Sequence, residues 1–306
     1  MSKKIKVWSN IGRLPYRNAG NEITKACLVL EGGAFRGVYG EGVTDYLMYK
    51  GLNFETIIGV SAGALNGYNI AAGQIGRAAR INLTYRHDTR YVGIKAIKAN
   101  HGVYGFDFAF NTFDEIEPLN RERLNSGMQR LIVVATDCET GKAKYFENGK
   151  CENLKKAIQA SASLPYISKM VEVEGRKYLD GGSSDKIPYR WAIDQGYEKI
   201  VVISTRPKGF RKPDRNKTNE RLAPKIYHNY PEYAIGLIEN NRFENNARAE
   251  MEELEKAGRI FTVDPPDFVN GVSRMEPDLE KLGHLYMLGF NDAKKLYRDI
   301  MEYLGK

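Results

Sequence analysis

The chain has 306 residues, 42% of them hydrophobic, and a net charge of +8. This length suits one large α/β domain with elaborations. No segment approaches the roughly 18 apolar residues of a membrane span, and the lysines after Met1 precede no apolar segment of signal-peptide length. We therefore expect a cytoplasmic protein that meets the inner membrane face, if at all, only peripherally.

The positive charge favours anionic partners in general. No nucleic-acid-binding motif accompanies it, so we expect no nucleic-acid partner. The three cysteines, Cys27, Cys138 and Cys151, lack metal-ligand spacing, and their odd number argues against a disulfide framework. Cys27 lies on a predicted core strand, where a thiol serves as a small buried hydrophobe.

The first predicted unit is a strand followed by a glycine-rich loop. Ala26–Leu30 is typical of a buried strand, Glu31–Gly37 forms the loop, and Val38–Lys50 fits a helix. Backbone N–H groups of such a loop can converge on a phosphate or an oxyanion. A dinucleotide fits less well, because Ala34 stands where Gly-x-Gly-x-x-Gly needs its second glycine and no clear ribose-binding acid follows about 20 residues on.

A second strand, turn and helix follow directly. The apolar run 54–58 leads into Gly59-Val-Ser-Ala-Gly63, and 64–72 fits a helix. A serine at a sharp strand-to-helix turn projects its hydroxyl from the sheet edge. An ordinary loop is the simpler interpretation of Gly-x-Ser-x-Gly alone, but this context is the one that the motif requires. Ser61 is therefore the candidate nucleophile, with the start of a helix beside it to stabilise an anion.

The third unit is a predicted hairpin, 171–179, that turns at Gly175 and leads into Asp180-Gly181-Gly182. A carboxylate at the end of a strand accepts a serine proton if it lies within hydrogen-bond reach. An aspartate that only stabilises a turn is the alternative for an isolated Asp-Gly-Gly. Asp180 is the candidate general base.

A histidine-containing triad is not favoured. His87 and His101 lie in polar, loop-like surroundings, His228 follows a charged linker, and His284 falls within a helical pattern. We expect all four histidines to be structural or exposed. A serine and aspartate pair without histidine fits the chain better.

Together these segments resemble the bacterial patatin-like phospholipases. That family has a glycine-rich loop with an arginine, a Gly-x-Ser-x-Gly turn and a later Asp-Gly-Gly, in this order. Segments 133–137 with 139–141, and Ala160–Pro165, also resemble the family. The likeness runs from about Ala26 to about Thr205, and Ser273–Asp292 is similar to the tail of one bacterial branch.

The resemblance implies a three-layer α/β/α fold with a largely parallel sheet, and a Ser61–Asp180 dyad that needs no metal or cofactor. It implies an oxyanion hole from Gly32, Gly33, Ala34, Phe35, Arg36 and Gly37, with Gly59, Gly63, Gly181 and Gly182 supporting the motifs. Ala34 departs from the family, since many members have a third consecutive glycine there. Arg36 is expected to brace the loop; contact with a lipid head group is the alternative.

Beyond Thr205 the sequence changes character. The basic segment 208–217 is either a contact for anionic lipid head groups or a solvated surface loop, and we favour the loop. Helical stretches are predicted over about 232–257 and 279–304, with a short strand at 259–263 between them. Tyr227, Tyr230 and Tyr233 either line an acyl channel or face the core.

We therefore predict an N-terminal extension (1–25), a catalytic core (26–205) and a mainly helical C-terminal region packed on it (206–306). The predicted function is a serine acyl hydrolase acting on carboxylic esters of lipids, phospholipid or lysophospholipid before neutral glyceride. Two alternatives stay open. One is an acyltransferase using the same dyad, and the other is a non-catalytic protein that binds an anionic ligand.

Overall fold

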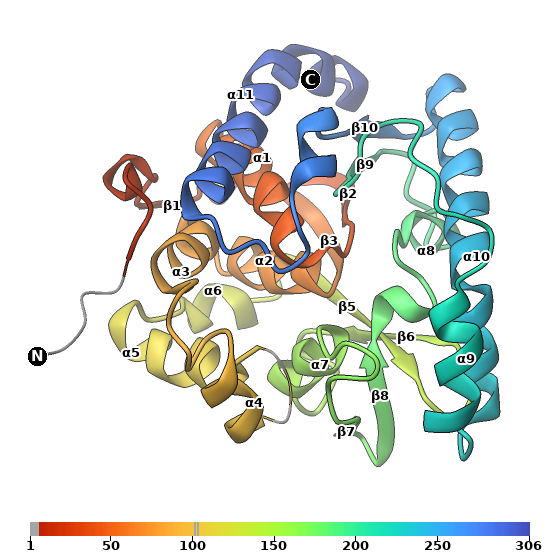
Figure 1. Cartoon of the computed structure of the whole chain (residues 1–306). Coiled ribbons are helices and arrows are strands. Elements are labelled where there is room, and N and C mark those ends of the chain that lie inside the picture. Colours follow the sequence, from red (N-terminus) through yellow and green to blue (C-terminus); the bar gives the residue numbers. More distant parts are fainter. Residues whose placement is uncertain (1–5, 101, 103) are drawn as a thin grey trace, which may run out of the picture.

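The computed structural model describes residues 6–100, 102 and 104–306, and an eight-stranded sheet forms its centre (Figure 1). The strand order is β10-β9-β2-β3-β5-β8-β7, with β6 also paired to β5. The strands are β2 (Thr24–Leu30), β3 (Phe54–Val60), β5 (Arg130–Asp137), β6 (Ala143–Glu147), β7 (Val171–Val173), β8 (Arg176–Asp180), β9 (Ile200–Ile203) and β10 (Phe261–Val263). A separate antiparallel pair joins β1 (Arg17–Asn18) to β4 (Gln74–Ile75).

The sheet is parallel from β10 to β5 and antiparallel where β5 meets β6 and β8. Its central strands are buried along nearly their whole length. Because both faces of such strands are covered, their sequences are continuous apolar runs. For that reason the strands at 26–30 and 54–58 were predictable from their sequence, whereas the strand at 133–137 was indicated by the family resemblance; the largely parallel sheet is confirmed.

Helices cover both faces of the sheet. They are α1 (Val38–Tyr49), α2 (Ala62–Ala71), α3 (Arg77–Tyr85), α4 (Ile94–Asn100), α5 (Phe113–Ile116), α6 (Arg121–Asn125), α7 (Leu154–Ser161), α8 (Tyr189–Asp194), α9 (Lys217–Ile226), α10 (Pro231–Lys256) and α11 (Leu279–Leu304). Leu28 and Leu30 belong to the apolar core shared with α1, α2, α7 and α11, whereas Cys27 and Val29 pack with α8 and α10. Alternate residues of β2 thus face opposite layers, which confirms the three-layer α/β/α fold.

The C-terminal elements build on this core. β10 pairs with β9 and extends the parallel sheet, and α11 runs beside α1 (Figure 1). The two helices approach so closely that a methyl group on Gly42 or Gly289 would strike the backbone of the other helix. Trp8, from the N-terminal segment, stacks edge-on against Tyr286 of α11. None of the helices formed by the described residues is long and apolar enough to cross a lipid bilayer.

Candidate active site

Ser61 alone connects β3 to α2. Its backbone has φ 55° and ψ −118°, a conformation uncommon for residues other than glycine. Strain of this kind concentrates at functional sites, where surrounding structure holds it in place. The amino terminus of α2 begins at the next residue, so the helix presents its partially positive end beside the serine.

The turn is tight, and each of its two glycines lies against backbone atoms of another residue. A methyl group on Gly59 would collide with the Gly63 carbonyl, and one on Gly63 would collide with the Leu30 carbonyl. The first contact closes the turn on itself, and the second brings it against the end of β2. The Gly-x-Ser-x-Gly spacing is therefore required by this geometry.

Asp180 ends β8 and is buried, with 6% of its surface exposed. Its Oδ1 accepts a hydrogen bond of 2.7 Å from the Gly182 amide. The buried Oδ2 has no hydrogen bond of standard geometry within the described residues, which leaves it available as an acceptor. Burial raises the pKa of this carboxyl above its ordinary value, and interactions with the Ser61 hydroxyl and the Gly182 amide offset part of that rise.

One segment at the end of α7 holds both residues. The Ser61 amide donates to the Ser161 hydroxyl at 2.8 Å, and the Asp180 amide donates to the Ser163 carbonyl at 2.8 Å. Both serines lie in the predicted motif 160–165, whose positioning role sequence analysis missed. In addition, the Thr136 hydroxyl donates to the Asp180 carbonyl at 2.8 Å.

The glycine-rich loop continues into a short 3-10 helix, Ala34–Gly37, rather than remaining an open loop up to Val38. In the predicted oxyanion segment, the amides of Gly32, Phe35 and Arg36 already donate to backbone carbonyls. Within the described residues, the amides of Gly33 and Ala34 have no acceptor, and both residues line a cavity together with Ser61. These two amides are free to bind an oxyanion. Ala34 has φ 52°, so alanine occupies a conformation that favours glycine.

Within the described residues, Arg36 forms no hydrogen bond or ion pair with Asp180; its Nε donates to the Val272 carbonyl at 2.8 Å. The side chain thus ties the loop to the segment before α11. Burial lowers the pKa of Arg36 to about 10, and the nearby charges of Arg206 and Arg274 add to this. The loop therefore lies within a concentration of arginines.

A network of buried ion pairs holds the first residue of the same loop, Glu31, in place. Glu31 pairs with Arg248 of α10, and its other oxygen accepts a 2.6 Å hydrogen bond from the Thr205 amide. Lys186 bridges Glu31 at 3.2 Å and Glu244 at 3.1 Å. These cations hold the pKa of Glu31 below its ordinary value despite full burial. Sequence analysis missed all four side chains, and only the Glu244–Arg248 spacing on one helix face gave a signal.

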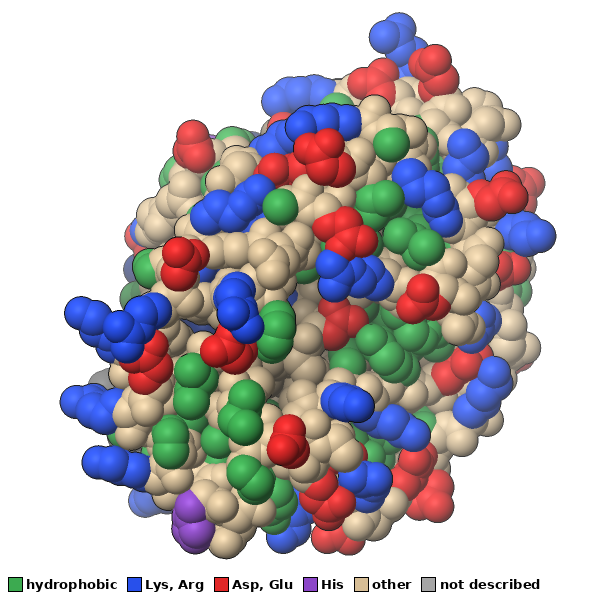
Figure 2. Space-filling model, turned by 90° about the vertical axis from the view of Figure 1, so that its right-hand side faces the viewer, with side chains coloured by type: hydrophobic (Ala, Val, Ile, Leu, Met, Phe, Trp, Pro, Cys, Tyr) green, Lys and Arg blue, Asp and Glu red, His purple; other side chains and the backbone are tan. Residues whose placement is uncertain are grey.

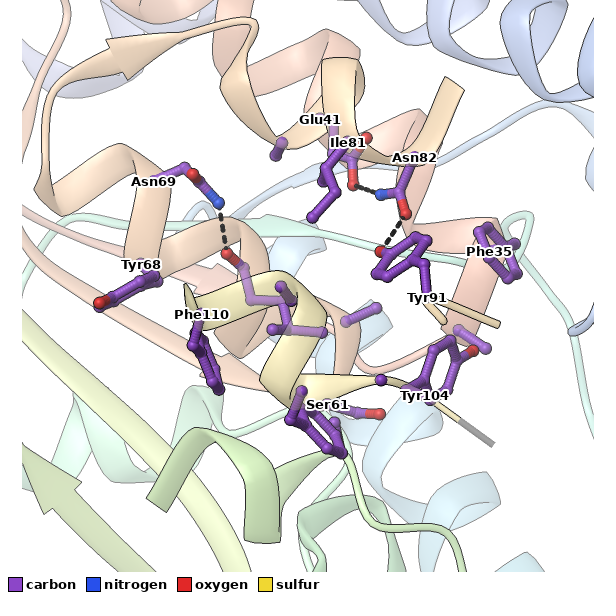
Figure 3. Close-up of a pocket in the computed structure, with 18 of the residues that line it drawn as sticks. Phe35, Glu41, Ser61, Tyr68, Asn69, Ile81, Asn82, Tyr91, Tyr104 and Phe110 are labelled. Carbon is purple, nitrogen blue, oxygen red and sulfur yellow. Dashed lines mark hydrogen bonds between the residues drawn. The ribbon is translucent and has the colours of Figure 1, made fainter. Parts of the chain in front are cut away.

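An apolar cavity opens on one side of Ser61 (Figure 3). Its walls come mainly from Leu65, Tyr68, Ile81, Tyr104, Phe106 and Phe110. At its far wall the Tyr91 hydroxyl donates to Asn82, which in turn donates to Glu41, each bond 2.6 Å long (Figure 3). Apolar walls next to a candidate nucleophile suit the hydrocarbon part of an acyl ester.

A polar cavity of about 260 Å³ opens beside the same serine. It is lined by Asp180, by the free amides of the glycine loop and by three cations, Lys186, Lys212 and Arg274. Apolar side chains complete its wall: Leu164, Pro165, Ile167 and Leu237. Ser61 and Ala34 line both cavities. The serine therefore stands where an apolar and a cationic pocket meet.

The comparisons with known proteins decide the family. The model described as patatin-like phospholipase matches residues 28–193, more than half of the chain. The chain belongs to the patatin-like phospholipase family. This membership implies lipid acyl hydrolase activity in general terms. A second model, a domain of unknown function designated DUF6363, matches residues 230–305, which span α10, β10 and α11.

Relatives and solved structures agree with this patatin-like assignment. The chain is 27% identical over 264 residues to the uncharacterized protein YjjU of Escherichia coli, covering 81% of this chain and 71% of that protein. It is 31% identical over 191 residues to an uncharacterized NTE family protein of Mycobacterium bovis, covering 61% of this chain and 51%, about half, of that relative. The fold matches VipD of Legionella pneumophila with a TM-score of 0.50, 14% identity, and coverage of 98% of this chain and 72% of that one.

The three histidines that the structure describes line neither of the cavities beside Ser61. His87 is exposed, the His228 ring contacts the Lys225 carbonyl, and the His284 ring packs edge-on against Phe268. His101 lies outside the described residues. The described chain contains no group of three or more His, Cys, Asp or Glu side chains arranged to hold a metal ion.

Two of the three clustered tyrosines belong to the core, and the third, Tyr230, is half-buried and accepts a hydrogen bond from Lys177. Tyr227 and Tyr233 are buried and pack edge-to-face at 4.9 Å, and Tyr166 contacts Tyr227 at 5.5 Å. Neither Tyr227 nor Tyr233 lines the apolar cavity, whose aromatic wall comes instead from residues between 68 and 110 that sequence analysis did not single out. Those aromatics carry no local motif, so the sequence offered no signal for them.

Proposed function

We propose that the protein is a serine hydrolase of lipid carboxylic esters, with Ser61 as nucleophile and Asp180 as general base. The observation that carries this proposal is the buried Asp180 carboxyl, which lines one cavity together with Ser61 and keeps its Oδ2 free of hydrogen bonds within the described residues. Catalytic hydrogen bonds are often loose without substrate and tighten in the complex. A carboxyl with a raised pKa is also a better base than an ordinary aspartate.

In the first step the Ser61 Oγ forms a bond to the ester carbonyl carbon, and its proton passes to Asp180. The carbonyl oxygen becomes an oxyanion, which the free amides of Gly33 and Ala34 stabilise. The bond to the alcohol oxygen then breaks, and the alcohol leaves with the proton from Asp180. Ser61 now carries the acyl group as an ester.

In the second step a water molecule attacks this ester. Asp180 takes one proton from the water, a second oxyanion forms, and the bond to Ser61 breaks as the serine regains the proton. The fatty acid leaves and the enzyme is restored. The apolar cavity supports a position for the acyl chain, and the polar cavity supports one for the alcohol.

The test is labelling with a fluorophosphonate probe together with turnover of a short-chain aryl ester. The native protein should show both, Ser61→Ala should show neither, and Asp180→Asn should lose roughly a hundredfold or more in turnover. Ser126→Ala, at an exposed serine whose hydroxyl bonds only to nearby backbone groups, and Asp185→Asn, at a half-buried aspartate that accepts from the Tyr145 hydroxyl, should keep both activities. A folded native protein that neither labels nor turns over would support the non-catalytic binding protein. Transfer to added glycerol in place of hydrolysis would support the acyltransferase.

A further inference from the structure

Resting on the proposed function, we propose that the apolar cavity selects an acyl chain that carries an oxygen atom toward its far end, as a keto or hydroxyl group. Glu41 donates a hydrogen bond to this oxygen and is the residue that sets the preference. The preferred substrate is then an ester of an oxygenated fatty acid rather than of a plain one.

Glu41 is a buried acid that lines the apolar cavity. It belongs to α1, and 5% of its surface is exposed. On the face of the molecule that carries α9 and α10, acidic side chains lie at the surface among lysines and arginines (Figure 2). Glu41 lacks such company, because no lysine or arginine of the described residues forms an ion pair with it. Burial without a neighbouring cation favours the neutral form of a carboxyl.

The contacts of Glu41 decide which of its oxygens carries the proton. Burial, together with the charge of Asp45, raises the pKa of Glu41 to about 8, so the side chain is a neutral acid below that pH. A neutral acid has one O–H group. Oε1 accepts the 2.6 Å hydrogen bond from the Asn82 amide. The proton therefore belongs on Oε2, which makes this atom a hydrogen-bond donor.

The donor on Glu41 has no acceptor in the protein. Oε2 is buried and forms no hydrogen bond within the described residues. Its neighbour Asn82 is already occupied, since the amide oxygen of Asn82 accepts from the Tyr91 hydroxyl at 2.6 Å. A buried donor without an acceptor is costly and is rare in native proteins. The free O–H group thus suits an acceptor that a ligand brings into the cavity.

The cavity connects the candidate nucleophile to this donor. Figure 3 shows Ser61 and the Glu41–Asn82 pair at opposite ends of the lining residues, with apolar side chains between them. The cavity volume of about 60 Å³ is several times the roughly 10–15 Å³ that one water molecule needs on the same measure. An acyl group on Ser61 would therefore extend through apolar surroundings toward Glu41. A plain hydrocarbon end would leave Oε2 unpaired, whereas an oxygen on the chain would pair with it.

The test moves one oxygen along the acyl chain of a soluble 4-nitrophenyl ester. Esters of octanoic acid and of its 5-oxo, 6-oxo, 7-oxo and 8-hydroxy derivatives are compared at about pH 6, where Glu41 is neutral. The added oxygen is far from the ester, so the ratio of kcat/KM between two esters measures recognition of the chain. We expect at least one oxygenated ester to exceed plain octanoate by about tenfold, the effect of one satisfied hydrogen bond.

A wall that offers no donor to the substrate predicts the reverse order. If water satisfies Oε2, or if the carboxyl is only structural, the oxygen of the chain enters an apolar cavity without a partner and weakens binding. A ratio of one or less for every oxygenated ester would therefore overturn the inference, and turnover of plain octanoate would leave the hydrolase proposal intact.

Two substitutions at the same position separate the donor from the shape of the side chain. Glu41→Met removes the donor and should abolish the preference. Glu41→Gln presents an N–H group in the place of the O–H group and should keep it. The ratio of two substrates is measured within one protein, so effects on folding or on the nucleophile cancel. A preference that persists in Glu41→Met, or that is lost in Glu41→Gln, would contradict the donor role.

The matched control is Asp45→Asn, at a second buried acid one turn along α1. Asp45 does not line the apolar cavity, and its carboxyl accepts from the Gly76 amide at 2.8 Å and from the Tyr286 hydroxyl at 2.9 Å. This variant should keep the native ratio. An equal loss of preference in Asp45→Asn and Glu41→Met would mean that the buried acids of α1 act only through the packing of the helix, and would overturn the inference.

Binding of the free acids keeps this inference separate from the hydrolase proposal. Calorimetry on the native protein compares octanoate with each of the oxygenated octanoates. Tighter binding of at least one oxygenated acid, lost in Glu41→Met, supports the site even if the protein turns over no ester. Binding no tighter than that of octanoate for every oxygenated acid overturns the site, whether or not esters are hydrolysed.

Discussion

The backbone amide of Ser61 donates its hydrogen bond to the hydroxyl of Ser161, 100 positions later in the chain. The Ser163 carbonyl, two residues further along, accepts from the Asp180 amide. The end of α7 therefore sets the spacing between the proposed nucleophile and base. A short Ala-Ser-rich segment with no reactive role of its own thus positions the site.

Ser161→Ala should slow the reaction without abolishing it. The substitution leaves the buried Ser61 amide unpaired, at a cost of about 1–3 kcal/mol, and loosens the strained turn. We expect kcat for an aryl ester to fall about tenfold, with KM little changed and fluorophosphonate labelling slowed to a similar degree. Ser163→Ala is the control, because its hydroxyl bonds only to the Gln159 carbonyl of the same helix. Native kcat in Ser161→Ala would contradict the positioning role.

Arg248→Met should destabilise the fold strongly. The substitution removes one of the two cations that the buried carboxylates of Glu31 and Glu244 share, the other being Lys186, and breaking a buried pair typically costs about 3–5 kcal/mol. The free energy of unfolding from urea titration measures this. Arg190→Met removes a cation from an exposed pair with Glu250 and should cost about 0–1 kcal/mol. Similar losses in both variants would show that the buried network adds nothing beyond a surface pair.

The central strands and the three motifs were predictable because they depend on local signals. A parallel strand covered on both faces appears as an apolar run, and the turn at Ser61 requires glycine at both ends. The predicted hairpin 171–179, the strand at 259–263 and the helix 279–304 have the same kind of local signature, and the structure places elements at each.

The rest depended on contacts between distant residues. Glu31 meets Arg248 across 217 positions, and nothing near Glu31 indicates that partner. The basic segment 208–217 reads as one charged loop, yet its fold turns Lys212 into the polar cavity while Lys208 stays on the surface. Arg274 lies in a segment that the resemblance covered without assigning it a role. The sign of each charge is visible in the sequence, but the tertiary fold decides which charged side chains form ion pairs.

Stability should fall as pH rises through the neutral range, because two buried acids of α1 resist ionisation. Burial raises the pKa of Glu41 to about 8 and of Asp45 to about 7, and the charge of Asp45 raises that of Glu41 further. In the unfolded chain both ionise near their ordinary values. The folded state therefore binds more protons, and it loses stability from about pH 4 to about pH 8.

Glu41→Gln should remove much of this dependence. The amide oxygen can still accept the 2.6 Å hydrogen bond from Asn82, but the side chain no longer ionises. We expect the variant to gain up to about 4 kcal/mol over the native protein at pH 8, and little at pH 4. Urea unfolding across this range measures it, with Glu115→Gln, at an exposed glutamate, as the control. A native pH profile that persists in Glu41→Gln would contradict the assignment.

The loss of activity at low pH, which is the acid limb of the pH profile, should reflect the protonation of Asp180. This base accepts a proton only when ionised, so kcat/KM falls as pH falls through its pKa. Because burial raises that pKa, the limb should lie above the ordinary aspartate value of about 3.9. The positive charge of Arg274 lowers the same pKa, so Arg274→Gln should move the limb to higher pH. Octanoylglycerol is the substrate of choice, since it has no group that titrates.

The control for this shift is Lys208→Gln, which removes one positive charge from an exposed lysine that pairs with Glu255. If the acid limb depended on the total charge of the protein, it would move equally in Arg274→Gln and Lys208→Gln. If the charge of Arg274 acts locally on Asp180, the limb moves only in Arg274→Gln. A limb that stays at the native pH in Arg274→Gln would mean that another group titrates, and Asp180 would then lose its place as the base. A limb that moves only in that variant shows that the positive charge of Arg274 acts on the base proposed to activate Ser61.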